Sequence, residues 1–135
     1  MHPNFTGVWK LNRGESKFGF LPPPRQRIDT IEHQDLRLRI LTHQKDSNGS
    51  LTVQRDLIIG AEAATIMILD RPRWIRAFWD EAALVVETKS QVSGATRKIE
   101  DRWTLDSDGE WLTIHRLHEL PGGVVQQRLR LQRRL

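Results

Sequence analysis

The chain contains no cysteine. This absence excludes disulfide-linked scaffolds, thiolate zinc sites and thiol nucleophiles. No apolar run approaches the roughly 18 residues that a membrane-spanning helix needs, and Met1, His2 and Pro3 open the sequence without a signal-peptide pattern. We therefore expect a protein without a membrane span that is cytoplasmic, or periplasmic if a leader has been removed.

The excess of positive charge is small. The 135 residues include 21 Lys and Arg against 17 Asp and Glu, which gives a formal net charge of +4. Hydrophobic residues make up 38% and charged residues 28%, a composition typical of a globular chain, and the length suits a single domain over residues 1–135. The arginines are scattered among acidic residues without interleaved aromatics, so we expect no nucleic-acid partner.

Short alternating segments dominate the sequence. Turn signals separate them, such as Asn48-Gly49, Ser93-Gly94 and Pro121-Gly122-Gly123. They predict eight to ten strands at spacings of about 8–12 residues. The predicted strands are 5–11, 28–33, 36–40, 51–59, 65–69, 73–79, 84–89, 96–105, 111–117 and 124–133. Residues 12–25 are expected to form a loop, and short helical turns are possible at 15–18 and 60–64.

Strands joined consecutively by tight turns predict an antiparallel meander. The two edge strands of a long meander leave backbone groups unpaired and prone to aggregation unless the sheet closes on itself. The predicted fold class is therefore all-β, a single up-and-down antiparallel barrel of 8–10 strands. A two-sheet sandwich is the alternative. The predicted inward-facing apolar residues include Trp9, Leu11, Leu36, Leu38, Ile40, Leu57, Ile59, Ile75, Ala77, Leu84, Val86, Leu112, Ile114, Leu129 and Leu131.

The segment Phe5-Thr6-Gly7-Val8-Trp9-Lys10-Leu11 resembles the first strand of the calycins, which include the lipocalins and the fatty-acid-binding proteins. In that family Gly-x-Trp follows an aromatic residue, the Trp closes the barrel base, and a basic residue near the chain end packs across it. The resemblance implies this structural role for Trp9, with Arg133, or else Arg128 or Arg130, as the basic partner.

A looser resemblance extends along the chain to small bacterial lipocalin-like domains. It rests on Trp79-Asp80, Leu84-Val85-Val86 and Trp103-Thr104-Leu105. Two features depart from the fatty-acid-binding proteins. Residues 12–25 are too short and too rich in proline for their two-helix lid, and the absence of tyrosine removes their Arg-Tyr carboxylate clamp. The resemblance therefore implies the fold and the role of Trp9 and leaves the ligand open.

Six polar residues fall on the inward-facing parity: Arg55, Thr88, Asp101, Arg116, His118 and Gln127. A buried charge must pair, reach water or meet a ligand. Asp101 could therefore bridge Arg55 or Arg116 as a structural ion pair. Alternatively, these groups belong to an apolar small-molecule pocket in which Arg55 and Arg116 hold an anionic or carbonyl group.

The second interpretation predicts a ligand site that comprises Arg55, Trp79, Thr88, Asp101, Trp103, Arg116 and Gln127, with Trp79 and Trp103 as an aromatic wall. We expect no cofactor. We also expect no metal site, because His115 and His118 are three residues apart on a strand and face opposite sides.

Three functional hypotheses follow. The first is binding of a small hydrophobic or amphipathic molecule inside the barrel, with anions among the candidates. The second is an enzyme of isomerase, cyclase or lyase type with Asp101 and His118 as the acid-base pair, for which Asp101 must lack a bidentate arginine partner. The third is an interaction domain with a packed interior. Trp74 and Trp111 are candidates for exposed aromatics, which leaves a homodimer open.

Overall fold

The computed structural model describes residues 2–134, and this part of the chain contains ten strands and no helix. Neither helical turn expected at 15–18 and 60–64 is therefore present, and no helix among these residues could cross a membrane. The strands are β1 (Gly7–Leu11), β2 (Gln26–Gln34), β3 (Arg37–Asp46), β4 (Gly49–Ile58), β5 (Ala64–Ile68), β6 (Arg71–Asp80), β7 (Ala83–Val92), β8 (Ala95–Leu105), β9 (Trp111–Leu120) and β10 (Gly123–Arg134).

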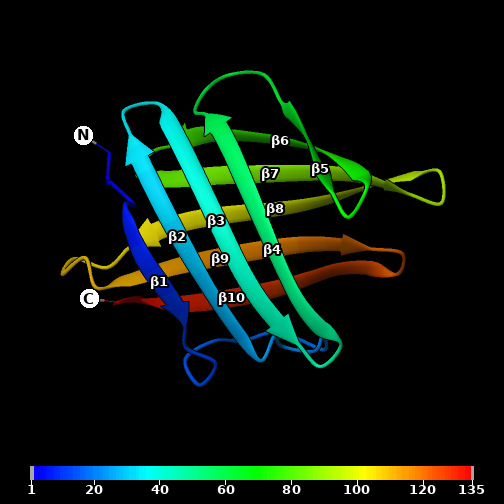
Figure 1. The fold of residues 1–135 in the computed structure, drawn as a ribbon, viewed down its shortest axis with the longest axis horizontal. Helices are drawn as coiled ribbons and strands as arrows, with labels where there is room; N and C mark the ends of the chain where they lie inside the picture. Colours follow the sequence, from blue (N-terminus) through cyan, green and yellow to red (C-terminus); the bar gives the residue numbers. More distant parts are fainter. Residues whose placement is uncertain (1, 135) are drawn as a thin grey trace.

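The strands form one antiparallel sheet that curls into a nearly closed barrel, as the hairpin signals predicted. The sheet order is β4-β3-β2-β1-β10-β9-β8-β7-β6-β5, so the first and last strands pair and join the two halves. In Figure 1, β1 to β4 cross steeply over the layer of β6 to β10. Strands β4 and β5 stand at the two ends of the sheet and are not hydrogen-bonded to each other, which leaves a seam in the wall.

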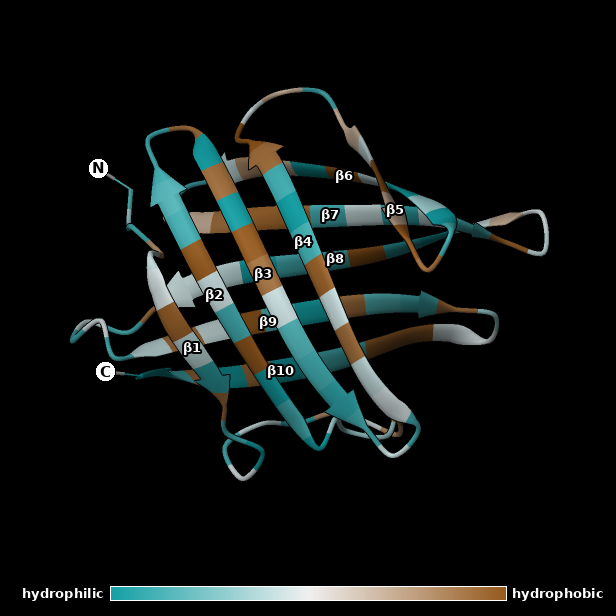
Figure 2. Ribbon diagram, in the orientation of Figure 1, coloured by the Kyte–Doolittle hydropathy of each residue, from teal (hydrophilic) through white to brown (hydrophobic). Residues whose placement is uncertain are grey.

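Alternating side chains fill the space between the two layers. Figure 2 shows this alternation as bands of hydrophobic and hydrophilic colour along the front strands. Inward residues such as Leu38, Ile40 and Leu84 are fully buried, as their parity predicted. Leu36 is an exception, because it lies in the turn after Asp35, whose φ is +54°, and is 55% exposed.

The indole of Trp9 closes one end of the barrel. It is completely buried, and its Nε1 donates to the Phe5 carbonyl oxygen at 3.0 Å. The Arg133 guanidinium lies over the Trp9 ring, 4.3 Å from its centroid, and donates to the carbonyl oxygens of Thr6 and Gly109. Arg130 instead lies over the ring of Trp111. Of the three arginines considered from the sequence, Arg133 is the one that packs on Trp9.

Residues 12–25 form a loop, as predicted, and this loop crosses the end of the barrel opposite Trp9. Its backbone pairs with β10 through two Lys17–Arg128 hydrogen bonds of 2.8 Å. The side chain of Gln127 also donates to the Phe18 carbonyl oxygen at 3.0 Å. Hydrogen bonds from Asn12 to Arg130 and from Arg25 to Lys45 also attach the two ends of the loop to the barrel. The loop thus brings apolar side chains such as Phe18 and Leu21 over the interior.

Candidate functional site

Two adjacent cavities occupy the half of the barrel interior away from Trp9. The larger has a volume of about 250 Å³ and is lined by Arg27, Thr42, Gln44, Leu51, Val53, Arg55, Ile68, Arg73, Ile75, Thr88, Ile99, Asp101 and Arg116. The smaller has about 170 Å³ and is lined by Leu11, Phe18, Leu21, Pro22, Pro24, Arg27, Gln44, Arg116, His118, Gln127 and Leu129. Arg27, Gln44 and Arg116 line both, so the two cavities adjoin at these side chains.

Arg116 and Asp101 form a bidentate ion pair inside the barrel. They face each other on β9 and β8, with Nε–Oδ1 and Nη2–Oδ2 distances of 2.8 and 3.0 Å. Burial alone would raise the pKa of Asp101, but the charge and hydrogen bonds of Arg116 lower it overall. The carboxylate is therefore ionised and already engaged by its neighbour.

A second interior ion pair lies on β2. The Nε of Arg27 contacts Oδ2 of Asp29 at 3.0 Å, and the two side chains are only 7% and 2% exposed. Asp29 also accepts a hydrogen bond from the Thr42 hydroxyl group. These inward charges were absent from the predicted site, because the sequence did not determine which parity of this strand faces the interior.

Arg55 lines the larger cavity without a carboxylate partner. It forms no ion pair within residues 2–134. Burial lowers the pKa of Arg55, and the charges of Asp29 and Asp101 only partly oppose this effect. An arginine remains protonated even after such a shift, so its charge persists inside the barrel.

Arg73 adds a further positive charge at the side of the larger cavity. It lies on β6 and donates to the Pro72 carbonyl oxygen at 3.3 Å, and it too forms no ion pair in the described part of the chain. Arg73 was not among the site residues predicted from the sequence. The larger cavity therefore has four arginines and one aspartate in its wall, and Asp29 provides one more negative charge next to Arg27.

The other predicted polar residues divide between the two cavities. Thr88 lines the larger cavity, whereas His118 and Gln127 line the smaller one. Burial lowers the pKa of His118, and the nearby charge of Arg116 lowers it further. The imidazole is therefore neutral at pH 7 and can donate one hydrogen bond and accept another.

Trp79 and Trp103 do not line either cavity. They belong to an aromatic cluster at the closed end with Phe5 and His33. Trp103 packs edge-on against Phe5 with ring centroids 5.4 Å apart, and Trp79 stacks near the same ring at 6.2 Å. Both indoles thus contribute to the barrel floor, and the expected aromatic wall is not part of the cavity lining.

No group of three or more His, Asp or Glu side chains within residues 2–134 is arranged to hold a metal ion. The cavity wall offers guanidinium, hydroxyl, amide and imidazole groups together with the aspartate that Arg116 engages. This set of groups is suited to recognising an anion.

No protein-family model matches the chain, and no curated protein matches it by sequence. Solved structures do match. A secretory abundant heat soluble protein of Ramazzottius varieornatus superimposes with a TM-score of 0.71 at 13% identity, covering 96% of this chain and 94% of that one. The zebrafish ileal bile acid-binding protein complexed with cholic acid gives 0.67 at 10% identity, covering 97% and 98%. The Manduca sexta fatty-acid-binding protein gives 0.58 at 12% identity, covering 95% and 98%.

The fold is that of the calycin barrels. The resemblance seen in the first strand therefore extends to the arrangement of nearly the whole chain. At these identities the comparison establishes the fold alone, and the function must be argued from the cavity.

Proposed function

We propose that this calycin-like barrel binds a small amphipathic molecule with an acidic group, the apolar part in the two cavities and the acid on Arg55. The observation that carries the proposal is the unpaired charge of Arg55 in the wall of an internal cavity. Arg55 is partly buried and donates to no protein acceptor within residues 2–134, so its guanidinium group is free to form charge-assisted hydrogen bonds with an anion in the cavity.

The rest of the cavity wall suits such a molecule. Apolar side chains from β4, β5, β6 and β8 surround Arg55, among them Leu51, Val53, Ile75 and Ile99. Small-molecule pockets combine an apolar lining with a few polar groups and have volumes of about 300–1,000 Å³. The two cavities together reach the lower part of this range, which favours a compact ligand or a short acyl chain.

The fold neighbours support the same substrate class. One is a fatty-acid-binding protein and another is a bile acid-binding protein complexed with cholic acid, and both ligands are amphipathic acids. The carboxylate contact proposed for this chain differs from an Arg-Tyr clamp, since the sequence contains no tyrosine.

The enzyme hypothesis receives less support. A general base must have a free lone pair and a pKa near the working pH. Asp101 is held by both ends of the Arg116 guanidinium, and its pKa is lowered rather than raised. We therefore assign Asp101 a structural role, in which it neutralises Arg116 and leaves Arg55 as the cation available to a ligand.

Calorimetric titration with octanoate and with octanol tests the proposal, since the two molecules share an apolar chain and differ in charge. We expect octanoate to bind more tightly than octanol, and Arg55→Gln to weaken octanoate binding by about tenfold or more, the equivalent of one charge-assisted hydrogen bond. Arg37→Gln is the matched control, because Arg37 is exposed at the start of β3 and forms no ion pair among the described residues.

Two results would contradict the proposal. Equal affinity for octanoate and octanol would show that charge does not contribute to binding. Unchanged octanoate affinity in Arg55→Gln would show that another group receives the acid, and Arg73→Gln would then be the next variant to measure.

A further inference from the structure

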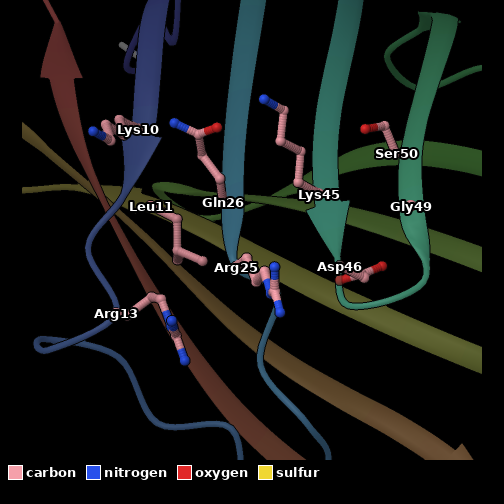
Figure 3. Close-up of a pocket in the computed structure, with 9 residues that line it drawn as sticks. All are labelled: Lys10, Leu11, Arg13, Arg25, Gln26, Lys45, Asp46, Gly49 and Ser50. Carbon is pink, nitrogen blue, oxygen red and sulfur yellow. The ribbon is translucent and has the colours of Figure 1, made fainter.

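A hollow in the outer surface lies where the ends of β1 and β3 and the starts of β2 and β4 meet the loop at residues 12–25. It has a volume of about 570 Å³ and is lined by Lys10, Leu11, Arg13, Arg25, Gln26, Lys45, Asp46, Gly49 and Ser50. Figure 3 shows the cationic side chains distributed over β1, β3 and the two loop ends. We propose that this hollow binds a phosphate group that carries two or more negative charges.

The charges around the hollow are almost all of one sign. Lys10, Arg13, Arg25 and Lys45 are exposed, and none of them forms an ion pair within residues 2–134. Asp46 is the one carboxylate in the lining, and its Oδ2 accepts a hydrogen bond from Gln44 at 3.3 Å. The lining of this concave surface therefore contains four cations and one anion.

Several arginines elsewhere on the outer surface pair with carboxylates of neighbouring strands or adjacent turns, in the pairs Arg39–Asp56, Arg76–Glu87, Arg102–Asp80 and Arg130–Asp106. Exposed Arg37 and Arg71 form no ion pair within residues 2–134, but neither lies in a hollow with three other cations. Such pairing limits repulsion between like charges. The hollow lacks these counter-charges, so its positive potential is available to an anion from solution.

Hydrogen bonds fix the backbone that carries the cationic side chains. Gln26, Lys45 and Ser50 stand in register across β2, β3 and β4, and the Arg25 amide donates to the Lys45 carbonyl oxygen at 2.8 Å. The turn that carries Arg13 is fixed as well, because the Asn12 side chain accepts from the Glu15 amide at 3.0 Å. Only the long side chains need to adapt when an anion arrives.

The residue types select the class of ligand. Two guanidinium groups can each bind phosphate oxygens in a bidentate manner, and two ammonium groups add point charges. The Gln26 amide and the Ser50 hydroxyl group supply neutral donors at the same rim. A single exposed carboxylate gains little from one surface cation, so a dianionic phosphate ester benefits more from this arrangement than a simple acid. The phosphate could belong to a lipid headgroup or to a soluble molecule.

The site is independent of the proposed cavity ligand. It shares Leu11 with the smaller cavity, but its four cations are absent from the lining of both cavities. Variants of these exposed residues should therefore leave octanoate binding and the folded structure unchanged.

The test uses two probes, inorganic pyrophosphate followed by amide chemical shifts and vesicles followed by cosedimentation. The vesicles contain phosphatidylcholine with or without phosphatidic acid. We expect either probe to bind at low salt, with pyrophosphate shifts concentrated at Lys10, Arg25 and Lys45, and binding to weaken as salt screens the charges. The double variant Arg25→Gln/Lys45→Gln should reduce affinity about tenfold or more, because it removes two charge-assisted contacts.

Arg37→Gln/Arg71→Gln is the matched control, since it removes the same charge from exposed positions outside the hollow. Binding of pyrophosphate alone supports a soluble phosphate source, and binding only to phosphatidic acid vesicles supports a lipid headgroup. Binding of both supports the shared phosphate chemistry. The proposal is overturned if neither probe binds, if the control weakens binding as much as the test variant, or if the shifts lie elsewhere on the barrel.

Discussion

Arg133 fills the space into which a side chain on Gly7 would project. A Cβ built on Gly7 would collide with Nη1 of Arg133, and it would lie 3.3 Å from Nε1 of Trp9. The φ of Gly7 is also +154°, in a range that side-chain-bearing residues rarely adopt. The glycine of the Gly-x-Trp segment is therefore required by the same arginine that covers the indole.

We predict that Gly7→Ala lowers the free energy of unfolding by about 1–3 kcal/mol, through this overlap and the backbone strain. Gly123→Ala is the control, because Gly123 has a φ of +144° and open space around its missing side chain. Urea unfolding of Gly7→Ala, Arg133→Ala and the double variant measures the coupling. The loss of unfolding free energy in the double variant should be smaller than the sum of the losses in the two single variants. Simple additivity would show that the two residues do not interact.

The interior ion pair gives the second prediction. Asp101→Asn removes the charge that opposes Arg116 while it keeps the shape of the side chain. Because an unpaired buried cation is then left beside Arg55 and Arg27, we expect the free energy of unfolding to fall by about 3 kcal/mol. Urea unfolding at pH 7 checks this value.

Asp56→Asn is the control for that measurement. Asp56 also pairs with an arginine of a neighbouring strand, Arg39, at 2.7 Å, but both side chains are more than half exposed. Ion pairs in water contribute little, so this variant should leave stability nearly unchanged. A similar loss in both variants would show that the interior location of Asp101 is irrelevant.

Arg55 gives the third prediction, which concerns the protein without ligand. Arg55→Met replaces an unpaired interior charge by an apolar side chain of similar length. The ligand-free protein should become more stable by about 1 kcal/mol, because binding residues are commonly kept at the expense of stability. Thermal unfolding of the ligand-free variant tests this. A loss of stability would indicate that Arg55 has a structural partner and is not reserved for a ligand.

The fourth prediction concerns acid. Burial lowers the pKa of His33 below its ordinary value near 6.5, although the carbonyl group and charge of Asp35 oppose this shift. Its Nδ1 accepts from the Phe5 amide at 3.2 Å, and a protonated ring cannot accept that bond. The unfolded chain therefore takes up the proton at a higher pH than the folded chain does. The free energy of unfolding should decrease as the pH falls below about 6.5, until the lowered folded-state pKa is passed.

His33→Gln tests this pH dependence, with His43→Gln as the control, because His43 is exposed on the outer face of β3. The slope of stability against pH should become shallower in His33→Gln and stay unchanged in His43→Gln. His118 contributes in the same direction, since burial and Arg116 lower its pKa too. An unchanged slope in His33→Gln would contradict the prediction.

Strand parity predicted much of the cavity from the sequence. The alternation along β4 directed Arg55 inward with Leu57 and Ile59, and the same reasoning selected Asp101, Arg116 and Gln127. Alternation did not identify the inward face of β2. Ile28 and Ile31 lie on opposite faces of this strand, so either assignment of the inward face buries one of the two. The inward set there is Arg27, Asp29, Ile31 and His33, so two interior charges were missed.

The height of a residue along the barrel was harder to predict than its direction. Trp79 and Trp103 face inward as expected, yet they lie at the closed end around Phe5 and not in the cavity wall. Height depends on the register and tilt of all the strands together, and no local pattern encodes it. The prediction that Leu36 faces the interior was wrong for a local reason, because Leu36 belongs to the turn at Asp35 and not to a strand.

The absence of hydrogen bonds between β4 and β5 affects how large a molecule the barrel can admit. Separating these two strands would break no hydrogen-bond ladder between them, and the Gly60 amide just after β4 donates to the Ala77 carbonyl oxygen of β6 at 2.7 Å. Leu57 of β4 belongs to the hydrophobic core, and Ile66 of β5 packs against that core. The barrel can then admit a ligand larger than the cavity volumes of this structure. The barrel can widen where β4 and β5 separate. The backbone amides along the unpaired edges of β4 and β5 should therefore exchange their hydrogen with solvent before those of any other strand.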